Sequence, residues 1–247
     1  MTGQIALLPF DKDYVQHTVK LSGLKPGEKY SYRVGNAEYD WWSDAGVITA
    51  AEGADEAFTF FYVTDPQAQR EDQYERFAEV IETAVKKYPD GRFIVSAGDQ
   101  VDAGENIKHW RYLLNSTKSL LNLPFMPTTG NHEDEGAVIT ENFVLPNVPE
   151  QELDTGVFYS YDYNNVHFTV LNTNDVEDDK LSDAQIEWMK NDIKSSDAKW
   201  KIVVLHKAPY SNGSHYDDGD VEGIRTQLGA LLPYLGVDLV LQGHDHV

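Results

Sequence analysis

The hydrophobic and polar positions of this 247-residue chain change their pattern near residue 58. Downstream, short apolar runs without alternation, typical of strands covered on both faces, occur at 58–63, 93–97, 125–128, 200–205 and 237–241. Between them, apolar residues recur at helical spacing over 74–88, 105–121, 182–193 and 221–235. A hairpin is expected over 158–171, around the turn dipeptide Asn164–Asn165. Strands that alternate with helices predict an α/β sandwich with a mixed sheet.

Upstream of residue 52 the pattern predicts only β-structure. Strands are expected at 17–21, 30–34 and 47–50, with turns at Pro26–Gly27 and Gly35–Asn36. The stretch Gly23–Val34 resembles the closing strands of a fibronectin type III-like sandwich, which needs about seven strands in all. We therefore expect a small, incomplete all-β module at 1–51, a linker at 52–57, and a main domain at 58–247 that is cut at its C-terminus.

The composition limits the classes of partner. The formal net charge of −21 argues against non-specific binding to nucleic acid or to an anionic membrane, because both need a basic face. No apolar run approaches the ~20 residues of a membrane span, and no signal-peptide pattern is seen at the N-terminus. Without cysteine, any metal must be bound by oxygen and nitrogen ligands. An acidic, cysteine-free chain is compatible with an extracellular or cell-envelope location.

Polar residues that bind metals well follow each buried strand of the main domain. They lie in the segments Thr64–Gln67, Gly98–Asp102, Gly130–Glu133, at His206, and in Gln242–His246. His244 and His246 are one residue apart, so both point to the same face of an extended segment. Because sites assemble where strands end along one edge of an α/β sheet, we expect these residues to form one site. Carboxylate, amide and imidazole together suit Zn, Fe, Mn or Co.

Each motif also has a simpler interpretation. Gly98–Asp99 and Gly130–Asn131 are turn dipeptides. A single histidine after a strand, such as His206, is more often a hydrogen-bonded structural residue. All of these interpretations would have to hold together at the ends of successive strands, so the metal site is the preferred prediction.

This order of motifs resembles the calcineurin-like metallophosphoesterases, including the purple-acid-phosphatase branch, over roughly Phe58–Val247. The resemblance implies a metallophosphoesterase-type fold with two transition-metal ions, Fe, Zn or Mn, that share Asp99 as a bridging ligand. It assigns one ion to Asp65, Gln67, Asp99 and His246, and the other to Asp99, Asn131, His206 and His244. His132 matches the catalytic histidine of the family.

The chain departs from the family at two positions. Asp102 stands where the purple branch has a tyrosinate ligand, so we expect no purple colour. The wider family has aspartate there, and Asp102 is expected to hydrogen-bond His132. Gln67 replaces a histidine and is a weaker ligand.

The segment Ala208–His215 looks like the substrate loop of the purple branch. This makes His215 and Arg225 candidates for phosphate contacts, and the alternative for each is a surface loop residue.

The resemblance implies hydrolysis of phosphate monoesters by a metal-bridging hydroxide, with His132 as general acid and a small phosphorylated substrate. Two alternatives stay open at this point. A phosphodiesterase acting on nucleotides or lipid head groups uses the same metal core. A non-catalytic envelope binding module is the alternative from another class of protein.

Overall fold

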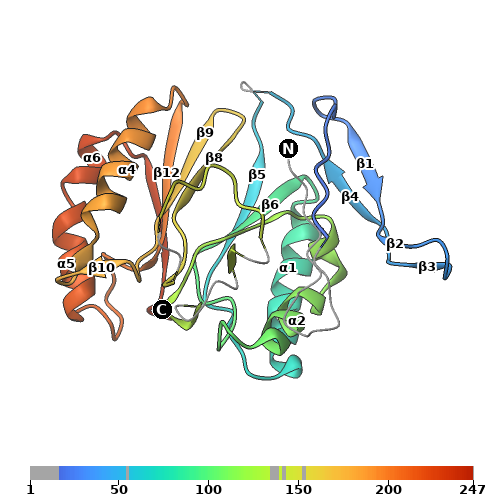
Figure 1. The fold of residues 1–247 in the computed structure, drawn as a ribbon, viewed down its shortest axis with the longest axis horizontal. Coiled ribbons are helices and arrows are strands. Elements are labelled where there is room, and N and C mark those ends of the chain that lie inside the picture. The colour runs from blue at the N-terminus through green and yellow to red at the C-terminus, as the bar shows by residue number, and fades with distance from the viewer. Residues whose placement is uncertain (1–16, 54–55, 134–138, 141–142, 152–153, 247) are drawn as a thin grey trace.

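The main domain is built on two β-sheets that face each other (Figure 1). The computed structural model describes residues 17–246, except 54–55, 134–138, 141–142 and 152–153. The first sheet has the order β5–β6–β7, all parallel: Thr59–Val63, Gly91–Ser96 and Phe125–Pro127. The second has the order β13–β12–β9–β8: Leu239–Gly243, Trp200–Lys207, Val166–Val170 and Tyr159–Tyr163. Its strands are parallel except for the β8–β9 hairpin, so the mixed α/β sandwich is confirmed.

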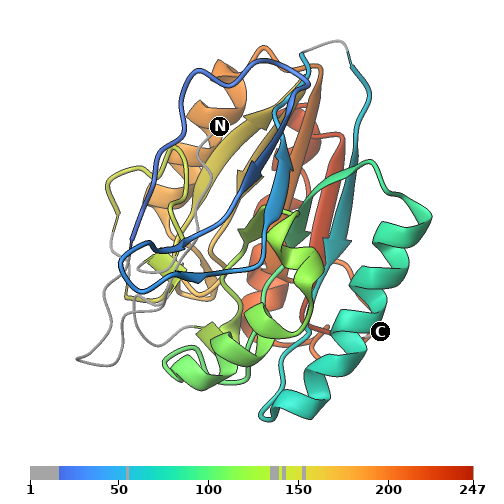
Figure 2. The same ribbon diagram turned by 90° about the vertical axis from the view of Figure 1, so that its right-hand side faces the viewer.

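Helices cover the outer face of each sheet (Figures 1 and 2). The first sheet is covered by the 3-10 helix η1 (Glu71–Tyr74), α1 (Glu75–Lys87) and α2 (Ile107–Asn115). The second is covered by α4 (Asp183–Ser195), α5 (Gly219–Leu228) and α6 (Leu231–Tyr234). Two short strands, β10 (Val176–Glu177) and β11 (Lys180–Leu181), form an antiparallel pair. A short 3-10 helix, η3, spans Asn131–Glu133.

Aromatic side chains join the two sheets at the centre of the sandwich. Phe60 of β5 stacks on Phe93 of β6 at 5.6 Å between ring centroids, and it meets Phe168 of β9 edge-on at 5.5 Å. A second buried cluster, which includes Met189 and Leu205, fills the space between the second sheet and α4–α6. Burial on both faces explains why β6 and β12 show no alternation in the sequence, whereas the outer face of β5 leaves Tyr62 exposed.

Two predicted helices are interrupted in the structure. The segment 105–121 forms α2 and then η2 (Lys118–Leu121), because the Thr117 hydroxyl accepts the N–H of Ser119 and begins a new turn. The segment 221–235 is divided between α5 and α6. The ring of Pro233 would clash with the carbonyl of Gly229 in a continuous helix, which explains the break.

The N-terminal segment forms two small antiparallel pairs. β1 (Lys29–Tyr32) pairs with β4 (Gly46–Thr49), and β2 (Gly35–Asn36) pairs with β3 (Trp41–Trp42). Two predictions were wrong. The run 17–21 has no strand partner and stays largely exposed, and Gly35–Asn36 lies in a strand because the turn falls at 37–40.

Side chains fasten this segment to the main domain. The Tyr32 hydroxyl donates to the carbonyl of Leu121 at 2.7 Å, and the Asn122 side chain accepts the N–H of Val47 at 2.8 Å. The fibronectin-like origin of the segment and its boundaries at 51 and 57 stay predictions. Across the described residues, no helix combines the length and the apolar character that crossing a membrane requires.

Candidate metal centre

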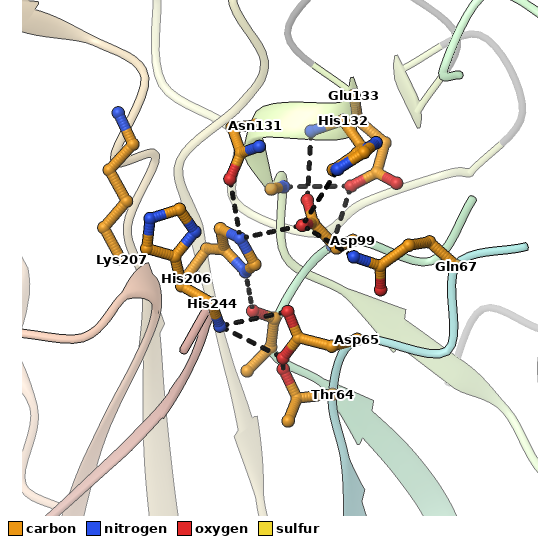
Figure 3. Close-up of polar contacts among 12 residues, drawn as sticks. Thr64, Asp65, Gln67, Asp99, Asn131, His132, Glu133, His206, Lys207 and His244 are labelled. Carbon is orange, nitrogen blue, oxygen red and sulfur yellow. Dashed lines mark hydrogen bonds and ion pairs between the residues drawn. The ribbon is translucent and has the colours of Figure 1, made fainter. Parts of the chain in front are cut away.

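Loops that follow the parallel strands, together with the end of β12, bring the predicted ligands to one edge of the two sheets, and Figure 3 labels all of them except His246. Asp99, which is 2% exposed, lies at the centre. Its Oδ2 lies 3.3 Å from Nε2 of His206 and 3.3 Å from Nε2 of Gln67. Two groups of possible ligand atoms therefore share Asp99. One group adds His206 and His244, and the other adds Asp65 and His246. Within each group the ligand atoms lie within 4.8 Å of one another.

The group with Asp65 is the more open of the two. Oδ1 of Asp65 lies 3.3 Å from Nε2 of His246, whose side chain is 59% exposed. The Gln67 amide nitrogen lies 3.1 Å from the same His246 nitrogen, and its oxygen is buried without a partner. Rotating the Gln67 side-chain amide by 180° exchanges its nitrogen and oxygen. The oxygen then faces Asp99 and His246, so Gln67 can be a ligand.

The group with His206 is the more buried of the two, with Asp99 and His206 buried and His244 partly exposed. The buried ring donates its Nδ1–H to the carbonyl of Ala97 at 2.8 Å, which leaves the Nε2 lone pair free. That nitrogen faces the Asn131 side-chain oxygen at 3.1 Å as well as Asp99. Burial opposes a charged ring, but Asp99 outweighs it and raises the pKa of His206. Lone pairs aimed at one point fit a bound cation.

The surroundings of His244 favour its neutral form. Burial, together with the nearby rings of His206 and His215, lowers the pKa of His244 to about 4. Metal binding requires the neutral ring, so this shift favours it. The His244 backbone N–H donates to both carboxylate oxygens of Asp65 at 3.0 Å, which joins the loops after β13 and β5.

Four of the predicted ligands adopt left-handed backbone conformations. The φ angles are 53° at Asp65, 49° at Asp99, 79° at His244 and 50° at His246. This region is uncommon for residues other than glycine, and such strain persists only where the surroundings impose it, often at functional sites. Five described residues outside the centre share such angles, so the backbone agrees with the side chains at these four positions but does not single them out.

Glycines next to the ligands give the loops room to interlock. A Cβ on Gly98 would lie 2.3 Å from the His206 ring, and one on Gly130 would lie 2.1 Å from Oδ1 of Asp99. A Cβ on Gly243 would lie 2.7 Å from Oδ2 of Asp65. Each of these glycines precedes one predicted ligand and makes space for another.

Glu133 lies in one of the predicted segments, but the sequence assigned it no role of its own. Its buried carboxylate accepts the backbone N–H groups of Asp99, Val101 and Gly130, each at 3.0 Å. Burial and the charge of Asp99 raise the pKa of Glu133 to about 8, against the effect of these donors. Glu133 joins the loops after β6 and β7, and its only signal was its place beside His132.

His132 is held by Asp102 in an unexpected way. Its Nδ1 donates at 2.7 Å to the main-chain carbonyl of Asp102, whereas we expected a bond to the carboxylate. Its Nε2 lies 3.9 Å from Oδ2 of Asp99, and the side chain is 34% exposed. Burial lowers the pKa of His132, but the carbonyl and the charges of Asp99, Asp102 and Glu133 outweigh burial and raise it.

The two candidates for phosphate contacts are placed differently. The His215 ring lies 4.1 Å from the His244 ring, and its Nδ1 bonds Asp218 at 2.8 Å, so His215 stands beside the ligand groups. The guanidinium of Arg225 donates to the carbonyls of Pro209 at 3.3 Å and Tyr216 at 3.1 Å. Arg225 supports the loop and does not join the cluster.

The chain is similar to known phosphatases over most of its length. It is 28% identical to purple acid phosphatase 21 of Arabidopsis thaliana, over 93% of this chain and 52% of the relative. Acid phosphatase type 7 of Homo sapiens is 23% identical over 93% of this chain and 55% of the relative. The chain thus spans about half the length of these curated relatives.

Solved structures show the same fold. The purple acid phosphatase PPD1 from yellow lupin has a TM-score of 0.68 at 18% identity, covering 91% of this chain and 45% of that one. The structure of PhoD has a TM-score of 0.66 at 16% identity, covering 94% and 59%. Residues 58–247 match the family model for calcineurin-like phosphoesterases. That match extends over all of the strands that carry the candidate ligands, and the chain belongs to the calcineurin-like phosphoesterase family.

Proposed function

We propose that this protein hydrolyses phosphate monoesters and that its metal centre holds two ions, with Fe, Zn or Mn as candidates. One observation carries the proposal: two groups of ligand-type atoms share the buried Asp99. The acid phosphatases among its relatives support a small phosphorylated substrate. When bound, the two ions would supply Lewis-acid activation of water and of the phosphoryl oxygens.

The residues around the centre have separate roles in this proposal. Asp99 would be shared by both ions. Asp65, Gln67 and His246 would hold one of them, and Asn131, His206 and His244 would hold the other. The His132 ring presents Nε2 to the substrate because its Nδ1 is engaged by the Asp102 carbonyl. From there it protonates the departing oxygen. His215 contacts the phosphate group. An extracellular or cell-envelope location is part of the proposal and rests on the resemblance to the purple branch alone.

The first test is metal content and ester preference. The protein is reconstituted with Fe, Zn or Mn, analysed for metal by elemental analysis, and assayed with p-nitrophenyl phosphate and with its bis ester. We expect two ions per chain and faster hydrolysis of the monoester. Fewer than one bound ion per chain after reconstitution would contradict the proposed two-ion centre. If the protein hydrolysed the bis ester faster, the proposed activity would be that of a phosphodiesterase and not of a phosphomonoesterase.

The second test removes the shared ligand. Asp99→Asn should abolish activity and most metal binding, because one carboxylate serves both ions. The control is Asp217→Asn, which removes the same charge at an exposed position of the neighbouring loop. An Asp99→Asn protein with two ions and wild-type turnover would exclude Asp99 from the centre.

A further inference from the structure

Asp245 lies between two predicted ligands but turns away from both ligand groups. Its side chain is buried, with the residue 7% exposed, and its Oδ1 accepts the backbone N–H of His215 at 2.8 Å. Its other oxygen, Oδ2, is buried without a hydrogen-bond partner. A Cβ on Gly213 would lie 2.5 Å from Oδ1, so the loop passes directly over the carboxylate.

The 208–216 loop is also held at other points, through three of its carbonyls, through the Tyr216 ring beneath the Arg225 guanidinium, and through the bond from the His215 ring to Asp218. The Gln242 side chain donates to the carbonyl of Tyr210 at 2.5 Å, and Arg225 donates to those of Pro209 and Tyr216. Asp245 differs because it binds the N–H of His215, whose ring stands 4.1 Å from the His244 ring. Asp245 therefore holds the backbone of the loop residue whose ring stands beside the ligand groups, while Asp218 bonds the ring itself.

We propose that Asp245 is a positioning residue for substrate binding: it fixes His215 beside His244 by tying the 208–216 loop to the ligand segment Gln242–His246. The kinetic part of this inference rests on the proposed function, whereas the positional part does not. One peptide segment thus supplies two ligands, His244 and His246, and the support of the substrate contact.

Hydrogen exchange at the His215 amide tests the positional part without any substrate. Asp245→Ala removes the acceptor and should abolish protection of that amide. Asp245→Asn keeps an acceptor oxygen and should retain most of the protection. The matched control, Asp217→Ala, changes an exposed carboxylate of the same stretch and should behave as wild type. Equal protection in wild type and Asp245→Ala would overturn the inference.

Kinetics on the metal-loaded protein test the second part. Asp245→Ala should keep two ions per chain and lose about 10²-fold in kcat/KM, mostly through KM, because a small displacement of a binding group is costly. In a His215→Ala background the same change should have little further effect, since both act through one contact. Additive losses, or loss of metal, would reject the positioning role. If the wild-type protein had no phosphatase activity, the proposed function would be wrong. Hydrogen exchange at the His215 amide would still test whether Asp245 positions His215.

Discussion

The orientation of the His132 ring determines what its removal should do. As a general acid, His132 should contribute about 10²–10⁴-fold to the rate. An alkyl alcohol needs a proton to depart, whereas p-nitrophenolate hardly does. We expect His132→Ala to keep both ions and to lose far more activity on alkyl phosphates than on p-nitrophenyl phosphate. Metal analysis and the two rates measure this.

The control for His132 follows from the bond at its Nδ1. Since the acceptor is a main-chain carbonyl, Asp102→Asn leaves the bond in place and removes only a charge. It should therefore have a small effect on both esters. A uniform loss on all substrates with an emptied site in His132→Ala would instead make His132 a structural support for Asn131.

The tyrosine hydroxyls near the site are engaged elsewhere. Tyr62 donates its hydroxyl to the carbonyl of Gln242, and the Tyr74 hydroxyl bonds the backbone of Ala68 and Gln100. With Asp102 in the position of the tyrosinate, an iron-loaded sample should show no strong absorption band in the visible spectrum. A strong band would assign a phenolate ligand, and Tyr62→Phe and Tyr210→Phe would then identify it.

At the scale of elements, the centre depends on how loops fit against one another. A Cβ on Gly130 would meet the Asp99 backbone nitrogen at 2.3 Å as well as its carboxylate, so the loop must move. Gly130→Ala should lower the metal affinity at least as much as loss of a supporting residue, about 10–100-fold. Competition with a chelator measures it.

The matched control is Gly219→Ala at the start of α5. There a Cβ would find only ordinary contacts, with the nearest atom at 3.4 Å. This variant should bind metal as wild type does. Unchanged affinity in Gly130→Ala would show that the loops after β6 and β7 adjust freely.

The sequence predicted the strands of the main domain better than its helix ends and loop contacts. Apolar runs indicate strands that are buried on both faces, and most residues of β6 and β12 are buried in this way. The breaks at Thr117 and Gly229 depend on a single capping bond and a single proline ring, which a periodic pattern does not register. Glu133 was missed for a related reason, because its partners are backbone N–H groups that exist only after the loops meet.

At the scale of the whole molecule, a buried histidine joins the second sheet to α4. The His167 ring bonds Asp162 at 2.8 Å and Asp192 at 2.9 Å. Burial opposes its charge, but the two carboxylates outweigh burial and raise the pKa of His167 above the ordinary 6.5. Its contribution to stability is therefore complete below about pH 6.5 and is lost as the pH rises through the folded-state pKa.

This linkage gives a stability test. At pH 6, His167→Gln should lower the free energy of unfolding by about 1.5–3 kcal/mol, the range for hydrogen bonds to charged groups. The difference from wild type should shrink toward pH 9, as measured by urea unfolding. Asp192→Asn removes the buried counter-charge and should weaken this pH dependence. A difference that stays constant from pH 6 to 9 would mean that the ring is neutral throughout.

The pairing of the N-terminal segment with the main domain could not be predicted from the chain. The bond from the Tyr32 hydroxyl to Leu121 joins residues 89 positions apart. Local alternation identifies β1 and β4, but it does not identify the surface against which they pack. Long-range contacts of this kind arise from the assembled shape.

The unequal burial of the two ligand groups implies two time scales of metal exchange. His206 is fully enclosed, whereas the His246 side chain is 59% exposed at the rim. An incoming chelator reaches the rim first, so one ion should leave rapidly and the other slowly. Following metal release after addition of a chelator should show two phases, and release in a single phase would contradict this. If the phases are separate, refilling the vacated rim position with a different element would yield a hybrid centre whose composition is set by the order of loading.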